Sequence, residues 1–505
     1  MWLNGVMARI RLIGEVSMSQ PKKPRKVPAA RKPSPKAPAM SRARAKLIDE
    51  LVEKLRREER ERLGPASTFE ERQDAGFEIM SEVLRKKTDA DLREQVTDAD
   101  EVDVDGKRFR RLEQASSATY FSRFGAHHIE EALYREVGVR NGPTIKPIEL
   151  RAGIVEHMTP EMARVVGELS AERGSRPLQK TLRCVGYASP SRAFLANRVT
   201  AMGAEIADIA AELEGAARAT EEMPAGVASI SCGLDRMSVR MSEPVEGAPC
   251  TRREPYERSP PPQMEHHYRK AWVGSVTAND AEGNALFTWR YGMEADADAF
   301  ELGGRVAADV AFIVDAHPQA RVFCIQDAAP ELDVLPRALT TSLPSDKDVV
   351  ELVDFEHLAG YLDAVATACD PEDRHDMKSW YRATLLSDDA GIDRIQSNLR
   401  RQAKRLPHDA TEARAAMAAA LSYIRPRKDK MRYASHYRQN LPIGSGATES
   451  TCWHMQQRVK LPGQSWEPRG LRGTLAIRAL VLSERWESAW NHYATFHRAE
   501  VSICP

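Results

Sequence analysis

The chain has 505 residues, of which 42% are hydrophobic, so it can hold about three domains with apolar cores and is not wholly disordered. It lacks any run of about 18 or more apolar residues, which argues against a membrane-spanning helix, and charged residues interrupt its first segment, which makes a poor signal peptide. The seven cysteines form no C-x-x-C pair, so neither a cysteine zinc ribbon nor a disulfide framework is supported, and a cytoplasmic location is expected.

Positive charge is concentrated in two segments, although the net charge of the chain is zero. Residues 1–46 hold twelve Lys or Arg against one acid, and residues 394–438 hold twelve against three. Clustered cations suit contact with nucleic-acid phosphates, because neutralising phosphates releases condensed counterions. Residues 1–45 are rich in Pro, Lys and Arg and have no apolar period, so we predict a disordered basic arm. A merely solvated tail explains the arm alone equally well.

Residues 46–150 are predicted to form two helices and a small mixed module. Apolar residues recur at helical spacing over 46–63, and a second helix is expected over about 68–87. Alternating residues around the Asp105-Gly106 turn indicate strands, and residues 127–139 are interpreted as an extended pair.

Residues 151–222 are predicted to be a helical, helix-turn-helix-like DNA-binding region. Thr159 and Ser191 are expected to cap helices, and a Gly-containing turn lies between them. In a helix-turn-helix the last helix enters a major groove. The helix after Ser191 offers three polar side chains for DNA contact, which are Arg192, Asn197 and Arg198. Helix pairs of this kind also occur in ordinary folds, and that alternative stays open.

Residues 223–495 are predicted to form an α/β catalytic domain with an RNase H-like order of elements. The five expected strands span 227–241, 266–278, 284–292, 320–327 and 349–355. Three antiparallel strands followed by helix–strand–helix–strand is the order of the RNase H-like fold. A long helical insertion is expected at about 357–438, before a final helix.

Three acids stand where metal-dependent phosphodiester chemistry would need them. Such chemistry uses two cations about 3.5–4 Å apart that carboxylates bridge, and Mg²⁺ prefers hard oxygen ligands. Asp235 lies on the first strand, Asp327 ends the apolar strand VFCIQ, and Glu449 follows a Gly-Ser-Gly turn at a helix start. Alone, each has an ordinary interpretation as an edge acid, a helix N-cap or a first-turn acid. Together, on one sheet and its last helix, they favour a shared site.

The C-terminal run 441–490 resembles transposases of bacterial insertion sequences of the Kra type. The shared hallmarks are a Gly-Ser-Gly turn, Glu-Ser, a basic pair, a Trp, Ile-Arg-Ala and Trp-x-x-x-Trp. Here they are Ile443-Gly444-Ser445-Gly446, Glu449-Ser450, Arg458 with Lys460, Trp466, Ile477-Arg478-Ala479, and Trp486 with Trp490. The stretches LVDFEHLAGYL and VFCIQDAAPEL are also similar to family segments. Arg236 and Ala328 depart from the family pattern, because relatives often have Gly after the first two acids.

The resemblance implies a DDE-type DNA transposase in which Asp235, Asp327 and Glu449 form the triad and bind Mg²⁺, or Mn²⁺ in its place. It further implies binding to terminal inverted repeats and target DNA, a homo-oligomer, no membrane attachment and a bacterial, nucleoid-associated location. Arg458 and Lys460 are expected to contact phosphates. Two alternatives stay open, an RNase H-fold nuclease without strand transfer and a catalytically inactive, sequence-specific DNA-binding protein.

Two residues between the second and third acids have open roles. Asp354 is the replacement candidate if one of the three acids points away from the other two. His357 is expected either to touch the active site or to serve at a helix start.

Overall fold

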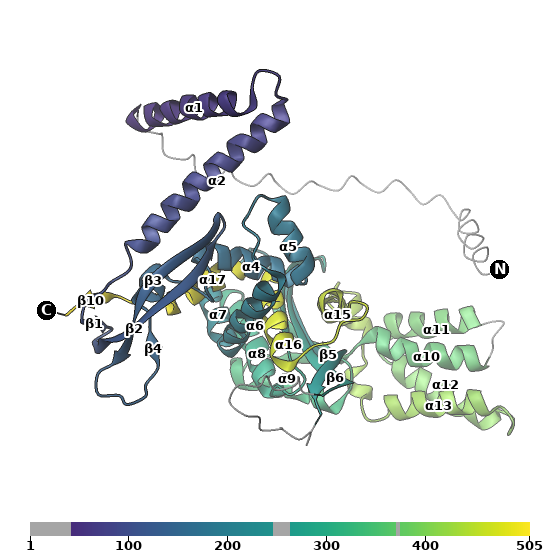
Figure 1. The fold of residues 1–505 in the computed structure, drawn as a ribbon. Coiled ribbons are helices and arrows are strands. Elements are labelled where there is room, and N and C mark those ends of the chain that lie inside the picture. The colour runs from purple at the N-terminus through teal and green to yellow at the C-terminus, as the bar shows by residue number, and fades with distance from the viewer. Residues whose placement is uncertain (1–41, 246–262, 370–373, 505) are drawn as a thin grey trace. The chain divides into compact units, whose positions relative to one another are not determined.

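The computed structural model describes residues 42–245, 263–369 and 374–504. They form a mixed α/β protein with one antiparallel and one mixed sheet (Figure 1). The chain divides into two compact units, Met1–Met80 and Ser81–Pro505. Nearly all of the predicted basic arm lies outside the described residues. Of the helices in the described ranges, none has both the length and the apolar character that crossing a lipid bilayer requires.

The first unit contains α1 and the start of α2. α1 (Arg42–Leu63) ends at Gly64, whose φ of 75° is the left-handed conformation that glycine adopts without strain. α2 (Phe69–Arg93) begins with a capping box, in which Thr68 N donates to Glu71 Oε2 at 2.7 Å and Glu71 N donates to Thr68 Oγ1 at 3.2 Å. Both predicted helices are confirmed, and α2 continues beyond its expected end.

The second unit includes a five-stranded antiparallel sheet in the order β10-β1-β2-β3-β4. Its strands are β1 (Glu101–Val104), β2 (Lys107–Ser122), β3 (Gly125–Glu136), β4 (Thr144–Ile145) and β10 (Val501–Ile503). Asp105 and Gly106 join β1 to β2 with φ angles of 51° and 81°, as expected of an Asp-Gly turn. The extended pair expected over residues 127–139 is instead one strand, because β3 pairs along its length with β2.

The helical region that follows shares a core with the C-terminal helices. Its helices are α3 (Pro147–Ala152), α4 (Pro160–Glu172), α5 (Ser175–Cys184), α6 (Arg192–Asp208) and α7 (Ala210–Arg218). The last four pack with α16 (Pro468–Leu482) and α17 (Trp486–Phe496). Where α6 meets α16, a Cβ on Gly473 would lie 2.6 Å from the carbonyl carbon of Gly203, so the two backbones touch. The predicted DNA-binding helix is thus α6, which Ser191 caps as expected.

Five strands form the mixed sheet, in the order β7-β6-β5-β8-β9. They are β5 (Ser229–Pro244), β6 (Met264–Asn279), β7 (Ala285–Met293), β8 (Arg321–Gln326) and β9 (Val349–Val353). β5, β6 and β7 are antiparallel neighbours, whereas β8 pairs parallel with both β5 and β9. The five predicted strands are confirmed, and β8 is nearly all buried, as its apolar run indicates.

Helices cover both faces of the mixed sheet, and successive residues of β5 point to opposite faces. Leu234 packs with α8 (Ala299–Ala316) on one face. Met237 packs with α15 (Gly446–Val459) and α16 on the other. After β8, a short 3-10 helix, η1 (Pro330–Asp333), leads into α9 (Val334–Ser342).

A helical insertion separates β9 from α15. It contains α10 (Phe355–Cys369), α11 (Arg374–Ser387), α12 (Gly391–Arg405), α13 (Thr411–Ile424), η2 (Lys428–Lys430) and α14 (Ala434–Tyr437). The four longer helices lie together in Figure 1 and enclose an apolar core of their own. Helices occupy the range of about 357–438 in which an insertion is predicted, and the first of them begins at Phe355.

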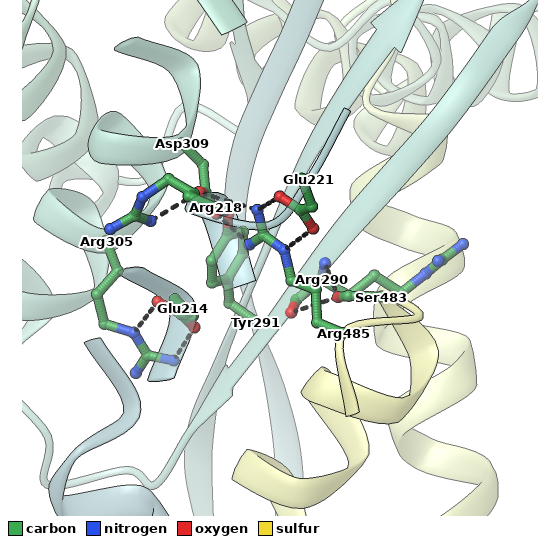
Figure 2. Close-up of polar contacts among 9 residues, drawn as sticks. All are labelled: Glu214, Arg218, Glu221, Arg290, Tyr291, Arg305, Asp309, Ser483 and Arg485. Carbon is green, nitrogen blue, oxygen red and sulfur yellow. Dashed lines mark hydrogen bonds and ion pairs between the residues drawn. The ribbon is translucent and has the colours of Figure 1, made fainter. Parts of the chain in front are cut away.

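A buried ion network fastens α7 to the mixed sheet and to the C-terminal helices (Figure 2). The Asp309 carboxylate is fully buried and accepts hydrogen bonds from Arg218 at 2.7 Å, from Arg485 at 2.6 Å and from the Tyr291 hydroxyl. Arg485 also pairs with Glu221 at 2.7 Å. Burial raises the pKa of Tyr291, and the charge of Asp309 raises it further, so the phenol stays a donor. These three donors provide the hydrogen bonds that a buried carboxylate requires.

Candidate active site

Three aspartates lie just beyond the residues at which the parallel pairings of β5 with β8 and of β8 with β9 end. The register of β5 with β8 ends where Cys232 pairs with Cys324, and Asp235 and Asp327 each lie three positions further along. The register of β8 with β9 ends directly before Asp327 and Asp354. The three aspartates therefore stand at the carboxyl end of the parallel part of the sheet, the position at which open α/β sheets bind their ligands, although β5 itself continues to Pro244 beside β6.

Asp235 and Arg236 point to opposite faces of the sheet. Oδ2 of Asp235 accepts a hydrogen bond from the Cys452 thiol of α15 at 3.0 Å. Arg236 instead pairs with Glu331 of η1, and its guanidinium lies 5.2 Å from the centroid of a Trp272 ring. The arginine that departs from the family pattern therefore lies away from the face that Asp235 shares with α15.

Helix α15 sits closely against β5 and β6, because small residues lie beneath its first turn. A Cβ on Gly233 would lie 2.3 Å from the Ile325 carbonyl oxygen and 2.8 Å from Thr448 Oγ1. Thr448 is buried, and its hydroxyl shares a 2.8 Å hydrogen bond with Ser275 of β6. Glu449 follows Thr448, so this contact fixes Glu449 at the end of the sheet that carries Asp235.

Glu449 has an exposed side chain in the first turn of α15. Partial burial raises the pKa of Glu449, and the negative charges of Asp354 and Asp235 raise it further. Burial also raises the pKa of the Cys452 thiol, with the charge of Asp235 adding to the effect, so this thiol stays protonated and donates. Carboxylates that repel one another in this way are frequent at functional sites.

Asp354 joins the end of β9 to the turn before α15. Its side chain is 2% exposed, and its two carboxylate oxygens accept hydrogen bonds from the backbone N–H groups of His357, at 2.6 Å, and of Ser445. Phe355 N donates to the Ile443 carbonyl oxygen at 3.2 Å. Because backbone donors engage both of its oxygens, Asp354 acts as a clamp on the Gly-Ser-Gly turn.

The helical insertion reaches Asp327 from two helices. The Tyr423 hydroxyl donates to Oδ1 of Asp327 at 3.3 Å, and His357 Nε2 lies 3.2 Å from the same oxygen. His357 lies in the first turn of α10, so it stands at a helix start, as one of its two expected roles requires, and also contacts Asp327. The sequence did not single out Tyr423, Cys452 or Thr448, because each lies in a helix and meets its partner only through tertiary packing.

The three acids predicted to bind metal have side chains of the chemical type that Mg²⁺ and Mn²⁺ prefer as ligands. Asp235, Asp327 and Glu449 offer carboxylate oxygens, which are the ligands that these hard cations prefer. Burial raises the pKa of Glu449, and the neighbouring charges of Asp354 and Asp235 add to the effect, so further acids stand close to this carboxylate. Within residues 42–245, 263–369 and 374–504, no three His, Cys, Asp or Glu side chains already meet at metal-ligand spacing. The fit therefore rests on ligand chemistry and strand register.

Three of the five residues predicted to bind DNA are exposed. They are Arg192 and Asn197 on α6, and Lys460 directly after α15. The side chain of Arg198 is 33% exposed and pairs with Glu156 at 2.9 Å. Arg198 is thus engaged within the protein, whereas the first three are accessible to solvent.

Arg458 departs from its prediction. It is 5% exposed, its Nε donates to the Ser170 carbonyl oxygen at 3.0 Å, and its guanidinium lies 5.0 Å from the centroid of a Trp466 ring. Burial and, to a smaller extent, the charge of Arg478 lower the pKa of Arg458 to about 10. The guanidinium packs between α15 and α4, which leaves no room for the expected phosphate contact.

Comparison of the chain with models of protein families and with curated proteins finds no match. The likeness of residues 441–490 to transposases therefore stays a prediction that rests on its own motifs.

Proposed function

We propose that this chain is a DNA transposase with an RNase H-like catalytic domain. The observation that carries the proposal is the arrangement of Asp235 and Asp327 at matching positions on neighbouring parallel strands, with Glu449 on the helix that covers the same face. Carboxylates that converge from distant sequence positions are what metal-dependent phosphodiester cleavage needs.

The order of elements supports the RNase H-like class. In the mixed sheet three antiparallel strands come first, two parallel strands follow with helices between them, and α15 then packs on the sheet beside β5. The long helical insertion interrupts the domain between β9 and α15, as the sequence predicts.

Asp235, Asp327 and Glu449 would hold Mg²⁺ or Mn²⁺ in this site. Such an ion, when bound, polarises the scissile phosphate and steadies the leaving oxygen. Other residues of the protein orient these acids. The Cys452 thiol donates a hydrogen bond to Asp235, and the close packing of α15 on Gly233 holds Glu449 in position. In the proposed reaction, water cleaves a phosphodiester bond and frees a 3′-OH at the element end. That hydroxyl then attacks a phosphorus of target DNA, forms a new phosphodiester bond and displaces the 3′ oxygen of the target strand as a free 3′-OH.

The proposed substrates are the terminal inverted repeats and a target duplex. Exposed Arg192 and Asn197 on α6 are suited to base edges in a major groove, and Lys460 is suited to a phosphate. Because two element ends must be brought together, we expect a homo-oligomer that acts at the nucleoid.

The test is incubation of the purified chain with Mg²⁺ and a duplex that carries the inverted repeats flanking its gene. We expect strand cleavage at the repeat end and, with a second duplex present, a covalently joined product. Cleavage without joining would favour the nuclease, and specific binding without cleavage would favour the inactive DNA-binding protein. Failure to bind or cleave these duplexes at any Mg²⁺ or Mn²⁺ concentration would reject the proposal.

A further inference from the structure

Contacts to the Asp327 carboxylate converge on one of its two oxygens. Oδ1 accepts from the backbone N–H of Ala328 and from the Tyr423 hydroxyl, and His357 Nε2 lies 3.2 Å away. In the described part of the chain, no hydrogen bond or ion pair is made to Oδ2. Oδ1 is therefore anchored by one local backbone N–H and by two side chains, and both of those side chains belong to the helical insertion.

The Tyr423 ring is itself held in place. Tyr423 is 9% exposed, and its ring stacks on that of Tyr361 with centroids 4.3 Å apart and planes inclined by 18°. The His357 ring lies near both, at 5.7 Å from Tyr423 and 5.8 Å from Tyr361. Burial raises the pKa of Tyr423, and the charge of Asp327 raises it further, so the phenol is a hydrogen-bond donor at any working pH.

Arg427, which follows α13 in the helical insertion, holds the backbone directly after Asp327. Arg427 donates to the Ala328 carbonyl oxygen at 2.9 Å and to the Tyr423 carbonyl oxygen at 3.2 Å, and its guanidinium lies 5.0 Å from the Tyr423 ring centroid. Tyr423 and Arg427 thus hold the side chain and the backbone of the Asp327 segment from almost a hundred positions later in the chain. Tyr423 lies on α13 and Arg427 follows it closely, so movement of α13 would disturb both contacts.

We propose that the helical insertion controls the geometry of the active site at Asp327, with Tyr423 and His357 as positioning residues. The inference rests on the proposed function. It means that Asp327 can present Oδ2 to a cation only while α10 and α13 hold Oδ1. Groups that orient metal ligands in this way typically change metal affinity or activity by about 10- to 100-fold when they are removed.

The experiment compares Tyr423→Phe, His357→Ala and His357→Gln with the unchanged chain, and Tyr437→Phe is the matched control. The Tyr423→Phe change removes only the hydroxyl and keeps the stacked ring. Tyr437 is 52% exposed on α14, so its hydroxyl should not matter. Mn²⁺ binding without DNA is measured by calorimetry, and cleavage is measured as separate kcat and KM values at several Mg²⁺ concentrations.

We expect Tyr423→Phe and His357→Ala each to weaken Mn²⁺ binding by about tenfold or more and to lower kcat with little change in KM. His357→Gln should recover part of the loss, because its amide nitrogen can reach the same oxygen. Mn²⁺ binding and kcat within twofold of the unchanged chain in both variants would overturn the inference. A lowered melting temperature with unchanged Mn²⁺ binding would also overturn it, because that is the result of a purely structural contact.

Asp327→Asn separates this inference from the proposed function. If Asp327→Asn is inactive while the Tyr423 and His357 variants bind Mn²⁺ and cleave normally, the inference alone fails. If Asp327→Asn cleaves as well as the unchanged chain, the proposed function fails, and with it the basis of the inference.

Discussion

Asp235 and Asp327 lie at matching positions on neighbouring parallel strands, each three residues beyond the last paired residues, Cys232 and Cys324. A parallel pair keeps residues of matching position at the same level, so this relationship brings two acids 92 positions apart in sequence to one edge of the sheet. Glu449 joins them from α15, and the charge of Asp235 is one cause of its raised pKa.

Asp327→Asn should abolish cleavage and leave DNA binding unchanged. The amide keeps the shape of the side chain but loses the negative charge that a divalent cation needs. Cleavage of a labelled element-end duplex in Mg²⁺ and binding of the same duplex by anisotropy are the two measurements. Equal cleavage by the variant and the parent would reject the metal mechanism, and loss of binding would show that the substitution disturbs more than the site.

Glu449→Gln should raise thermal stability near neutral pH and lose that advantage in acid. The folded-state pKa of Glu449 is raised, so the protonated form is favoured in the folded protein, and stability is lost as pH rises through this raised pKa. The neutral amide avoids the repulsion from Asp354 and Asp235. Below the unfolded pKa of about 4.3 the glutamate is protonated in both states and the difference vanishes.

The measurement is the melting temperature of both proteins from pH 4 to pH 8 in EDTA, so that metal binding does not contribute. A variant that is less stable than the parent at pH 7, or an advantage that grows towards acid, would contradict the charge argument. Glu449→Gln should also fail to cleave, which would make Glu449 a residue that function retains at the expense of stability.

The strands of the active-site domain could be predicted from sequence, because their signals are local. The run VFCIQ is apolar throughout, as a strand buried on both faces must be, and β5 alternates between faces that meet α8 and α15. Asp327 follows directly on such a strand, so its position at the edge of the sheet could be predicted too. The two predicted helices at 46–63 and 68–87 have similar local signals in their caps and in Gly64.

The residues that orient the acids could not be predicted, because their partners are distant in sequence. Tyr423 meets Asp327 across 96 positions, and Cys452 meets Asp235 across 217. The predicted phosphate contact of Arg458 disagrees with the structure for a related reason. A basic residue beside another at a helix end suggests a solvated face, but the packing of α15 against α4 buries its guanidinium. Burial of a long cation depends on which helix arrives next to it, and no local pattern encodes that.

Gly233→Ala should destabilise the fold by about 1–3 kcal/mol and reduce cleavage. The added Cβ would lie 2.3 Å from the Ile325 carbonyl oxygen, which is backbone and cannot rotate away, and 2.8 Å from Thr448 Oγ1. Relief of the clash pushes α15 off the sheet and moves Glu449 away from Asp235. Denaturant unfolding and a cleavage assay are the measurements.

Gly304→Ala is the matched control for that substitution. Gly304 lies within α8, and a Cβ there would meet no atom within 4 Å. Alanine is favoured over glycine inside a helix by up to about 1 kcal/mol, so this variant should be as stable as the parent or more so, with normal cleavage. Similar effects at the two positions would mean that the close approach at Gly233 has no consequence.

Asp309→Asn should destabilise the protein by about 3–5 kcal/mol, because it leaves the buried Arg485 and the partly exposed Arg218 facing a neutral amide. The fully buried side chain of Asp309 accepts from Arg218, Arg485 and Tyr291 (Figure 2). Asp315→Asn on the same helix is the control, since that side chain is exposed and should change stability little. Guanidinium unfolding of both variants checks the prediction, and a loss at Asp309 below about 1 kcal/mol would show that the network is not needed for folding.

DNA binding should have two separable contributions, one from α6 and one from the basic segment at the N-terminus. Arg192 and Asn197 are exposed on α6, where their polar ends could reach base edges, so replacing both with Ala should reduce the preference for element ends over random duplexes. Deleting residues 1–44, most of which lie outside the described residues, should weaken binding to every duplex alike. For every phosphate that the shortened chain no longer neutralises, the slope of log affinity against log salt should become shallower by about 0.9.

The measurement is a salt titration of binding to an element-end and a random duplex for the parent and both variants. Lys460→Ala serves as a comparison. Loss of this single exposed cation should make the slope of log affinity against log salt shallower by about 1 and should leave the preference for element ends over random duplexes intact. If the deletion removes the preference while the double replacement keeps it, sequence recognition lies in the N-terminal segment and not in α6.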